Sequence, residues 1–210
     1  MGVWRDRALP RVTDALLRGH DVGRLRERTC AGLSGEVLEI GFGSGLNVRF
    51  YPPEVTLVHA VEPSEVAWEL SHRRRQRVAT TIEHGGLDGQ RLDAEDASYD
   101  AVLSTFTLCS IPDVPQALAE VRRVLRPGGW LHFLEHGAAP ESDVAAWQRR
   151  LEPVQRLVGG GCHLTRDVPA LLTAAGLEVV EVETGYLPGP RPGRPWTYLY
   201  RGRAREATGS

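Results

Sequence analysis

Residues 37–45 constrain the fold more than any other part of this chain. The stretch opens with the apolar run Val-Leu-Glu-Ile, which is typical of a buried strand, and continues with Gly41, Gly43 and Gly45. Glycines let the backbone turn sharply and let a ligand approach without meeting a Cβ atom. A helix that starts after such a turn presents free N–H groups to a polar or anionic ligand. The stretch therefore predicts a strand, a tight turn and a helix N-terminus that together hold a ligand.

The spacing of these glycines narrows the kind of ligand. A dinucleotide fingerprint places its third glycine five residues after the first, and here that position holds Leu46, because the third glycine comes one residue earlier. An acid, Glu39, precedes the first glycine by two residues. An ordinary tight turn would also accommodate the three glycines, so the rest of the chain must decide between a ligand site and a plain turn.

Length and composition predict one globular domain. The 210 residues are enough to bury a sizeable core, and 41% hydrophobic with 25% charged residues is typical of a soluble protein. A net charge of −2 gives no electrostatic reason to expect nucleic acid as a partner. We find no apolar run of about 18 residues and no signal-peptide core. Together with the sparse cysteines, these features predict a cytoplasmic protein, and we leave its oligomeric state open.

The three cysteines, Cys30, Cys109 and Cys162, are widely spaced. An odd and sparse set fits a reducing compartment better than a disulfide scaffold. Because none of them belongs to a Cys-x-x-Cys pair, the sequence predicts no metal site.

Apolar periodicity predicts strands that alternate with helices. Strands are expected at residues 37–40, 56–61, 80–83, 101–105 and 130–134, with a closing pair at 177–183 and 196–200. Helices are expected at residues 64–76, 115–125, 143–158 and 167–175. Such alternation gives a doubly wound parallel sheet. We therefore expect an α/β, Rossmann-like fold whose seven-stranded sheet ends in an antiparallel strand.

The chain divides into three expected parts. Residues 1–35 carry apolar residues at helical spacing, and we expect either a helical lid over the ligand site or a structural cap on the sheet. Asp14, His20 and Asp21 are the polar candidates of this segment for lining a pocket. Residues 36–203 form the main domain, and residues 204–210 are expected to be a disordered tail.

The motifs together resemble the class I S-adenosylmethionine (SAM) methyltransferases. The resemblance is carried by the acid-x-Gly-x-Gly-x-Gly pattern at 39–45, the segment 92–100 and the Leu-Arg-Pro-Gly-Gly string at 125–129. It implies SAM as cofactor and S-adenosylhomocysteine as product. Glu62 ends the second strand and can accept from two ribose hydroxyls, and Asp88 would accept from the adenine amine. The cofactor-binding residues implied in this way are Glu39, Gly41, Gly43, Gly45, Asn47, Glu62, Pro63, Asp88, Gly89, Ser104 and Thr105.

Four further strings resemble one branch of that family: Gly-Ser-Gly-Leu-Asn at 43–47, Thr-Leu-Cys-Ser at 107–110, Glu-His at 135–136, and Gly-Cys-His-Leu-Thr-Arg at 161–166. They are similar to a bacterial group sometimes labelled phospholipid N-methyltransferases, and to mammalian methyltransferase-like proteins that methylate alkyl thiols. The mammalian members carry an N-terminal membrane anchor, which we do not expect here. The resemblance implies a small lipophilic acceptor, with a thiol favoured. Phospholipid amine N-methylation, small-molecule O-methylation and a non-catalytic SAM- or NAD-binding module are the alternatives.

Methyl transfer from a sulfonium is an in-line displacement, so the protein mainly supplies alignment and a dry site. A base is needed only where the acceptor carries a proton. His136 is the first candidate for it and His163 the second, although either could instead be a packed or surface histidine. The residues expected to form the acceptor pocket are Phe106, Leu108, Cys109, Glu135, Trp147, Cys162 and Tyr186. The cysteines need no covalent role, because the reaction needs no covalent intermediate.

Overall fold

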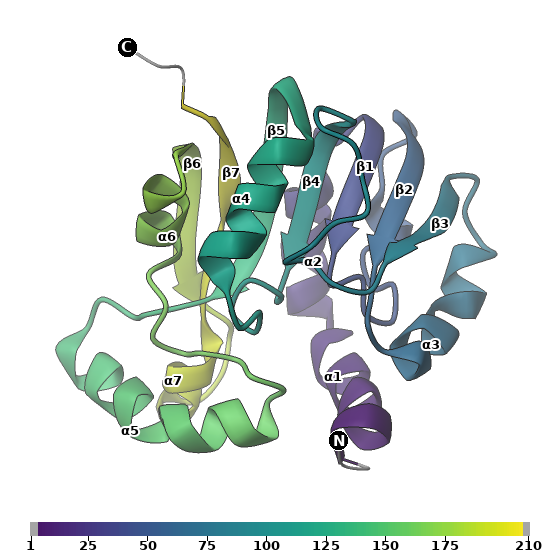
Figure 1. The fold of residues 1–210 in the computed structure, drawn as a ribbon. Helices are drawn as coiled ribbons and strands as arrows, with labels where there is room; N and C mark the ends of the chain where they lie inside the picture. Colours follow the sequence, from purple (N-terminus) through teal and green to yellow (C-terminus); the bar gives the residue numbers. More distant parts are fainter. Residues whose placement is uncertain (1–3, 208–210) are drawn as a thin grey trace.

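The computed structural model describes residues 4–207 and leaves residues 1–3 and 208–210 outside the description. Its centre is a seven-stranded sheet with the order β3-β2-β1-β4-β5-β7-β6 (Figure 1). The strands are β1 Gly35–Ile40, β2 Val55–Val61, β3 Thr81–Gly86, β4 Tyr99–Thr105, β5 Leu125–His136, β6 Leu177–Tyr186 and β7 Tyr198–Glu206. The first five pair in parallel, and β7 runs antiparallel to both β5 and β6. The predicted fold class, including the antiparallel final strand, is confirmed.

Helices cover both faces of this sheet (Figure 1). The α-helices are α1 Leu9–Leu17, α2 His20–Cys30, α3 Glu65–Arg75, α4 Val114–Val124, α5 Ser142–Val158, α6 Val168–Ala174 and α7 Arg194–Thr197, with shorter turns η1 Trp4–Ala8, η2 Val48–Phe50 and η3 Arg191–Gly193. Several begin where the sequence offers an N-cap: the side chain of Ser64 caps α3, that of Asp113 caps α4 and that of Asp167 caps α6.

The apolar core lies on the two sides of the sheet. One cluster packs the buried face of α4, with Leu118 and Val121, and that of α6, with Leu172, against strand residues such as Phe133. A second cluster joins Cys30 at the end of α2 to the opposite side of the central strands. Figure 1 shows α4 and α6 in front of the sheet and α2 behind it. The helical periodicity of these segments is therefore explained by burial of one face.

Two boundaries between the three expected parts differ from the expectation, and residues 196–197, expected to begin the last strand, belong to α7 instead. β1 begins at Gly35, so the boundary expected after residue 35 falls inside a strand. β7 continues to Glu206, so residues 204–206 belong to the sheet and not to a tail, and residues 208–210 lie outside the description. This end of the chain is mostly charged, so its sequence did not indicate a strand. Ala204 is buried while Arg205 pairs with Glu178 at the surface, which is the alternation of a strand with one buried face.

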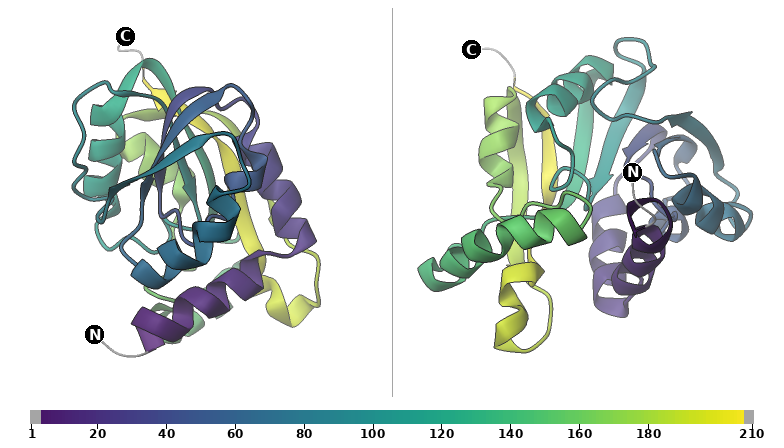
Figure 2. Two further views of the ribbon diagram at one scale, coloured as in Figure 1. Left: turned by 90° about the vertical axis from the view of Figure 1, so that its right-hand side faces the viewer. Right: turned by 60° about the horizontal axis from the view of Figure 1, so that its bottom comes forward.

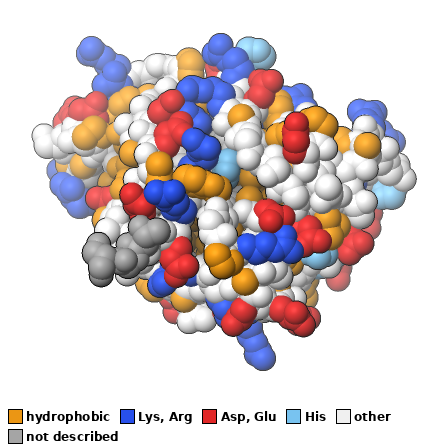
Figure 3. Space-filling model, turned by 90° about the horizontal axis from the view of Figure 1, so that it is seen from above, with side chains coloured by type: hydrophobic (Ala, Val, Ile, Leu, Met, Phe, Trp, Pro, Cys, Tyr) orange, Lys and Arg blue, Asp and Glu red, His pale blue; other side chains and the backbone are white. Residues whose placement is uncertain are grey.

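The carboxyl ends of the parallel strands point toward the bottom of Figure 1, where α1 crosses beneath the sheet (Figure 2). Figure 3 shows acidic and basic side chains interspersed at the opposite end. Arg126, near the start of β5, forms ion pairs with Glu36 and Asp100. Within residues 4–207, no helix combines the length and the apolar composition needed to cross a bilayer. In open α/β sheets, ligands bind at the carboxyl ends of the parallel strands.

Candidate functional site

A cavity of about 590 Å³ opens at the carboxyl ends of β1, β2 and β4. Its volume lies in the range of small-molecule and cofactor sites. The glycine turn after β1, the end of β2, the loops after β3 and β4, and helix α1 all contribute to its wall. It therefore lies where the strand order of the sheet reverses, between β1 and β4.

The glycine turn forms the floor of the cavity. Gly41, Gly43 and Gly45 have φ angles of 70°, 58° and 74°, a region that other residues rarely adopt. A Cβ atom on Gly41 would collide with the side chain of Thr107, whereas one on Gly43 would meet no atom closer than 3.9 Å. Gly41 and Gly43 line the cavity, and Gly45 packs behind it. The turn thus leaves open space above Gly43, where a ligand can approach the backbone.

Glu62 lies at the end of β2 and lines the cavity, as does Pro63. Its carboxylate accepts hydrogen bonds from the backbone N–H of Gly43, at 2.6 Å, and of Ser64, at 2.8 Å. Burial raises the pKa of Glu62, and these two backbone donors oppose the shift. The carboxylate is therefore fixed in orientation while each oxygen keeps a lone pair for a ligand hydroxyl.

Asp88 and Gly89 line the other end of the cavity, beside the apolar side chains of Leu87 and Ile111. The Asp88 carboxylate accepts from the backbone N–H of Gln90 at 2.8 Å. A planar ring with an exocyclic amine fits a wall that combines apolar side chains with one acceptor.

Glu39 and Asn47 do not line the cavity but lie behind the turn. Glu39 accepts hydrogen bonds from the Tyr51 hydroxyl and, at 2.9 Å, from the side-chain amide of Asn47. Burial raises the pKa of Glu39 to about 7. Asn47 also donates to Thr105 Oγ1 at 2.9 Å, and Thr105 does line the cavity. The two residues therefore hold the turn against β4 in this structure.

Arg26, on α2, lines the cavity and was not predicted from the sequence. It is 5% exposed, and its Nη1 donates to Asn47 Oδ1 and Thr105 Oγ1, both at 2.8 Å. Its Nε has no partner, and among the described residues no carboxylate lies within ion-pair distance of its guanidinium. Burial lowers its pKa to about 10, so the group stays charged at neutral pH. Burying a cation that has no ion-pair partner is costly, and an anionic ligand in the cavity would offset that cost.

Helix α1 also faces the cavity, through Leu9, Pro10, Thr13, Asp14 and Leu17. Asp14 Oδ1 accepts from Ser44 Oγ at 2.6 Å and pairs with Arg74 at 2.9 Å, which ties the helix to the glycine turn. Of the other two polar candidates of this segment, His20 is exposed and Asp21 is half-buried, and neither lines the cavity. The N-terminal segment thus contributes directly to the wall of the ligand site.

The loop after β4 forms the side wall and is anchored by Glu135. This carboxylate is fully buried and accepts from Ser104 Oγ at 2.7 Å and from the backbone N–H groups of Thr107 and Cys109, both at 3.1 Å. Burial raises the pKa of Glu135. Ser104 and Glu135 therefore shape the loop from behind, while Phe106 and Thr107 from the loop face the cavity.

The remaining predicted pocket residues fall into two groups. Leu108, Cys109 and Cys162 are buried beside the loop, close to the cavity but not on its surface. Trp147 is 54% exposed on α5, and the hydroxyl of Tyr186 donates to Glu141 at 2.5 Å, so neither borders the cavity. Apolar character alone does not tell which neighbour a side chain packs against.

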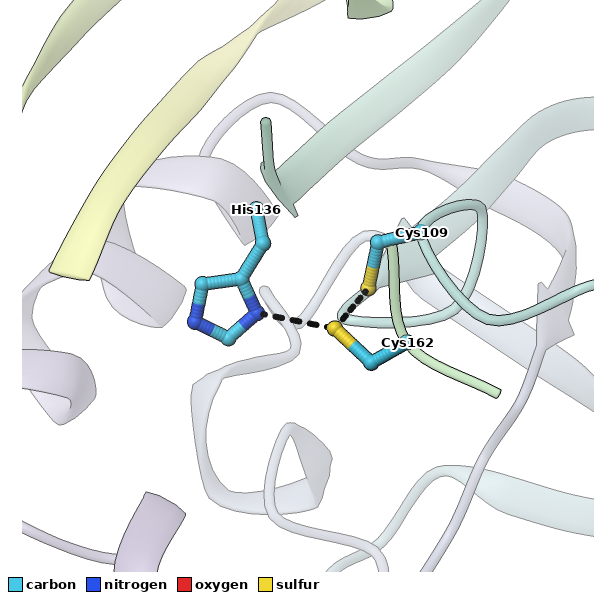
Figure 4. A group of neighbouring side chains, drawn as sticks. All are labelled: Cys109, His136 and Cys162. Carbon is cyan, nitrogen blue, oxygen red and sulfur yellow. Dashed lines mark hydrogen bonds between the residues drawn. The ribbon is translucent and has the colours of Figure 1, made fainter. Parts of the chain in front are cut away.

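The two candidate histidines have different surroundings. His163 Nδ1 lies 2.6 Å from Glu152, and desolvation lowers the pKa of this histidine. His136 lies at the tip of β5, where its Nδ1 is 3.8 Å from Cys162 Sγ, and that sulfur is 3.6 Å from Cys109 Sγ (Figure 4). The His136 ring packs on Phe106, with centroids 5.0 Å apart. Three of the branch-specific strings therefore meet at one point beside the cavity wall.

Comparisons with known proteins agree with this arrangement. Residues 38–133 match the family model described as a methyltransferase domain. Thiol S-methyltransferase TMT1B of Rattus norvegicus is 38% identical over 160 residues, which are 72% of this chain and 64% of that protein. Phosphatidylethanolamine N-methyltransferase of Cereibacter sphaeroides is 29% identical over 172 residues, 78% of this chain and 81% of that protein. The chain therefore spans less than two thirds of the length of the thiol methyltransferase.

Solved structures show the same fold. A putative methyltransferase from Bacillus halodurans superposes with a TM-score of 0.69 at 19% identity, covering 90% of this chain and all of the other. A possible histamine N-methyltransferase from Thermotoga maritima superposes with a TM-score of 0.67 at 21% identity, covering 98% of each chain. At this identity the likeness shows the fold alone.

Proposed function

We propose that this chain, which is similar to methyltransferases over most of its length, is a class I SAM-dependent methyltransferase and that it methylates the sulfur of a small lipophilic thiol. The similarity to thiol S-methyltransferases supports this acceptor. The observation that supports it most is a cluster of three side chains behind one wall of the cavity: Cys109, His136 and Cys162. They come from three strings that resemble the thiol-methylating branch.

The residues around the cavity fit SAM. Glu62 would accept from the ribose hydroxyls, and Asp88 would accept from the adenine amine between apolar walls. The open space above Gly43 would admit the amino-acid part of the cofactor. The guanidinium of Arg26 would pair with its carboxylate, which supplies the anion that this buried cation lacks.

The cofactor supplies an electrophilic methyl group on a sulfonium, and its loss from that sulfur leaves a neutral thioether. The acceptor sulfur forms the new C–S bond as the old one breaks, so the chain's task is alignment and exclusion of water. Leu9 and Leu17 of α1 and Phe106 provide apolar walls on the cavity side. Such walls suit an uncharged alkyl group better than a charged headgroup.

The proton of the acceptor has to leave before or during the transfer. A thiol with a pKa near 8.5 needs modest assistance at neutral pH. His136 stays the first candidate for that assistance, since His163 is held by Glu152. Cytoplasmic location and the division into lid and domain likewise stay predictions.

A phospholipid amine is the second candidate acceptor. It is favoured by the likeness to the phosphatidylethanolamine enzyme, which extends over more of that relative than of the thiol methyltransferases. An ethanolamine headgroup is cationic, and Arg26 would oppose its entry unless the cofactor carboxylate neutralises the guanidinium.

Mass spectrometry of products separates these acceptors. The purified chain is incubated with methyl-labelled SAM and a panel of alkyl thiols, amines, phenols and phosphatidylethanolamine vesicles. We expect label in a thioether and none in the vesicles. Label confined to the headgroup amine would replace the thiol proposal, and turnover on phenols alone would replace both.

A further inference from the structure

We propose that Cys109, His136 and Cys162 form a binding site for one thiophilic divalent cation, with Zn²⁺ as its simplest occupant. No ligand, family model or relative described above assigns a metal to this chain. The proposal concerns binding alone and does not depend on which acceptor is methylated.

Two of the three distances among these side chains match a tetrahedral site. Zinc bonds to sulfur at about 2.3 Å and to imidazole nitrogen at about 2.0–2.1 Å. Tetrahedral angles then place two sulfurs about 3.8 Å apart, and a sulfur and a nitrogen about 3.6 Å apart. The observed separations are 3.6 Å between the Cys109 and Cys162 sulfurs and 3.8 Å between Cys162 Sγ and His136 Nδ1. All three ligand atoms lie within 4.8 Å of one another, so small side-chain rotations would bring the remaining pair, Cys109 and His136, to the separation that a tetrahedral cation requires.

The side chains converge in the way that ligands do. Figure 4 shows both sulfurs and Nδ1 pointing into one small space, each from a different segment. The backbone that carries them is fixed independently: Glu135 accepts from the Cys109 N–H, and the His163 N–H donates to the Cys109 carbonyl at 2.7 Å. A preformed set of two thiols and an imidazole is the donor set that selects zinc over magnesium or calcium.

The described residues leave one tetrahedral position free, because no fourth Cys, His, Asp or Glu joins the group. Three protein ligands with an open position are typical of catalytic rather than structural zinc sites. Phe106 contacts His136, and Ser110 Oγ lies 3.6 Å from Cys109 Sγ; both residues also line the cavity. The site is thus a direct neighbour of the space proposed for the acceptor.

Metal binding would change what His136 can do. A neutral imidazole that coordinates through Nδ1 keeps its proton on Nε2, so a loaded His136 could not take a proton from an acceptor. The free-histidine role predicted from the sequence would then apply to metal-free protein. The expectation of no metal rested on the lack of a Cys-x-x-Cys pair, but the two cysteines that meet here are 53 residues apart in the chain.

The test is metal binding by the reduced, full-length chain. Protein stripped with a chelator and kept reduced by a phosphine is titrated with Zn²⁺ in competition with a chromophoric chelator, and separately with Co²⁺. We expect one equivalent of Zn²⁺, and a Co²⁺ spectrum with thiolate charge-transfer absorption and tetrahedral visible bands. Cys109→Ser, Cys162→Ser and His136→Ala should each lose at least tenfold in affinity. Cys30→Ala is the matched control, since Cys30 is equally buried but lies in the core at the end of α2.

The wild-type cobalt spectrum reports thiolate ligation directly, so the proposal can be judged even if a variant fails to fold. No zinc uptake by the wild type, or a Co²⁺ spectrum without thiolate absorption, would overturn the site. Retained affinity in both Cys109→Ser and Cys162→Ser would do the same, as would an equal loss in Cys30→Ala. Because none of these readouts involves methyl transfer, a failure here leaves the proposed function standing.

Discussion

Replacing Arg26 by methionine should remove the preference of this protein for a cofactor that carries a carboxylate. The side chain is buried, its Nε has no partner, and Glu39, the acid that acts on it most strongly, is hydrogen-bonded to Tyr51 and Asn47 instead. Methionine keeps the unbranched stem of arginine and loses every donor. The guanidinium is therefore free to meet the carboxylate of SAM, and the variant is not.

The size of the effect follows from the kind of bond. A hydrogen bond to a charged group is worth about 1.5–3 kcal/mol. Since each 1.4 kcal/mol is a factor of ten in affinity, Arg26→Met should weaken SAM binding about 10- to 150-fold. Decarboxylated SAM cannot form this bond, so its affinity should fall by much less.

Isothermal titration of both ligands against both proteins forms a double-mutant cycle. Arg24→Met is the matched control, because Arg24 is on the same helix but exposed and bonded to Asp21. Binding of decarboxylated SAM by Arg26→Met also shows that the cavity is intact. An equal loss for the two ligands would refute the pairing and leave Arg26 as a support for the turn.

Three further outcomes follow from the structure. Burial raises the pKa of Glu39 from 4.5 to about 7. Between these values the folded carboxyl stays protonated while the unfolded one ionises, so the free energy of unfolding should fall by about 3 kcal/mol as pH rises through that range. Urea unfolding of Glu39→Gln should lack this dependence on pH. Removing residues 1–18 spares α2 but deletes the wall made by α1, so the truncated protein should keep its circular dichroism spectrum and lose most turnover; unchanged kinetics would make the segment a cap. In metal-free protein, His136→Ala should slow thiol methylation about 10²–10⁴-fold at pH 7 and less above about pH 9, where the acceptor is already a thiolate; an equal loss at both pH values would exclude proton transfer.

Much of the fold is predictable because its signals are local. Strand runs, N-caps at Ser64, Asp113 and Asp167, and the glycine turn each depend on a few consecutive residues. The end of β7 was not predicted, because only one small apolar residue, Ala204, alternates there with charged residues. A sequence pattern of that kind does not distinguish a strand from a polar tail.

The site is predictable only where a residue is part of the turn or ends a strand. Gly41, Gly43, Glu62 and Asp88 line the cavity, since strand ends fix their positions, and their contact with a cofactor stays a prediction. Arg26 is one of 25 basic residues, and nothing in its neighbourhood marks it as the buried one. Arg26 is buried because of its contacts with segments far away in the sequence, at Asn47 and Thr105.

The loop after β4 links the cofactor side of the site to the cysteine–histidine cluster. Phe106 has a φ of 56°, a conformation that costs an ordinary residue about 1–3 kcal/mol and persists where its surroundings impose it. Its N–H donates to the Leu134 carbonyl at 2.7 Å, and Glu135 holds the next residues of the loop. The strained turn places the ring 5.1 Å from the Arg26 guanidinium and 5.0 Å from the His136 ring. One aromatic side chain thus separates the proposed carboxylate site from the proposed metal site, so a change at either side reaches the other through the position of Phe106.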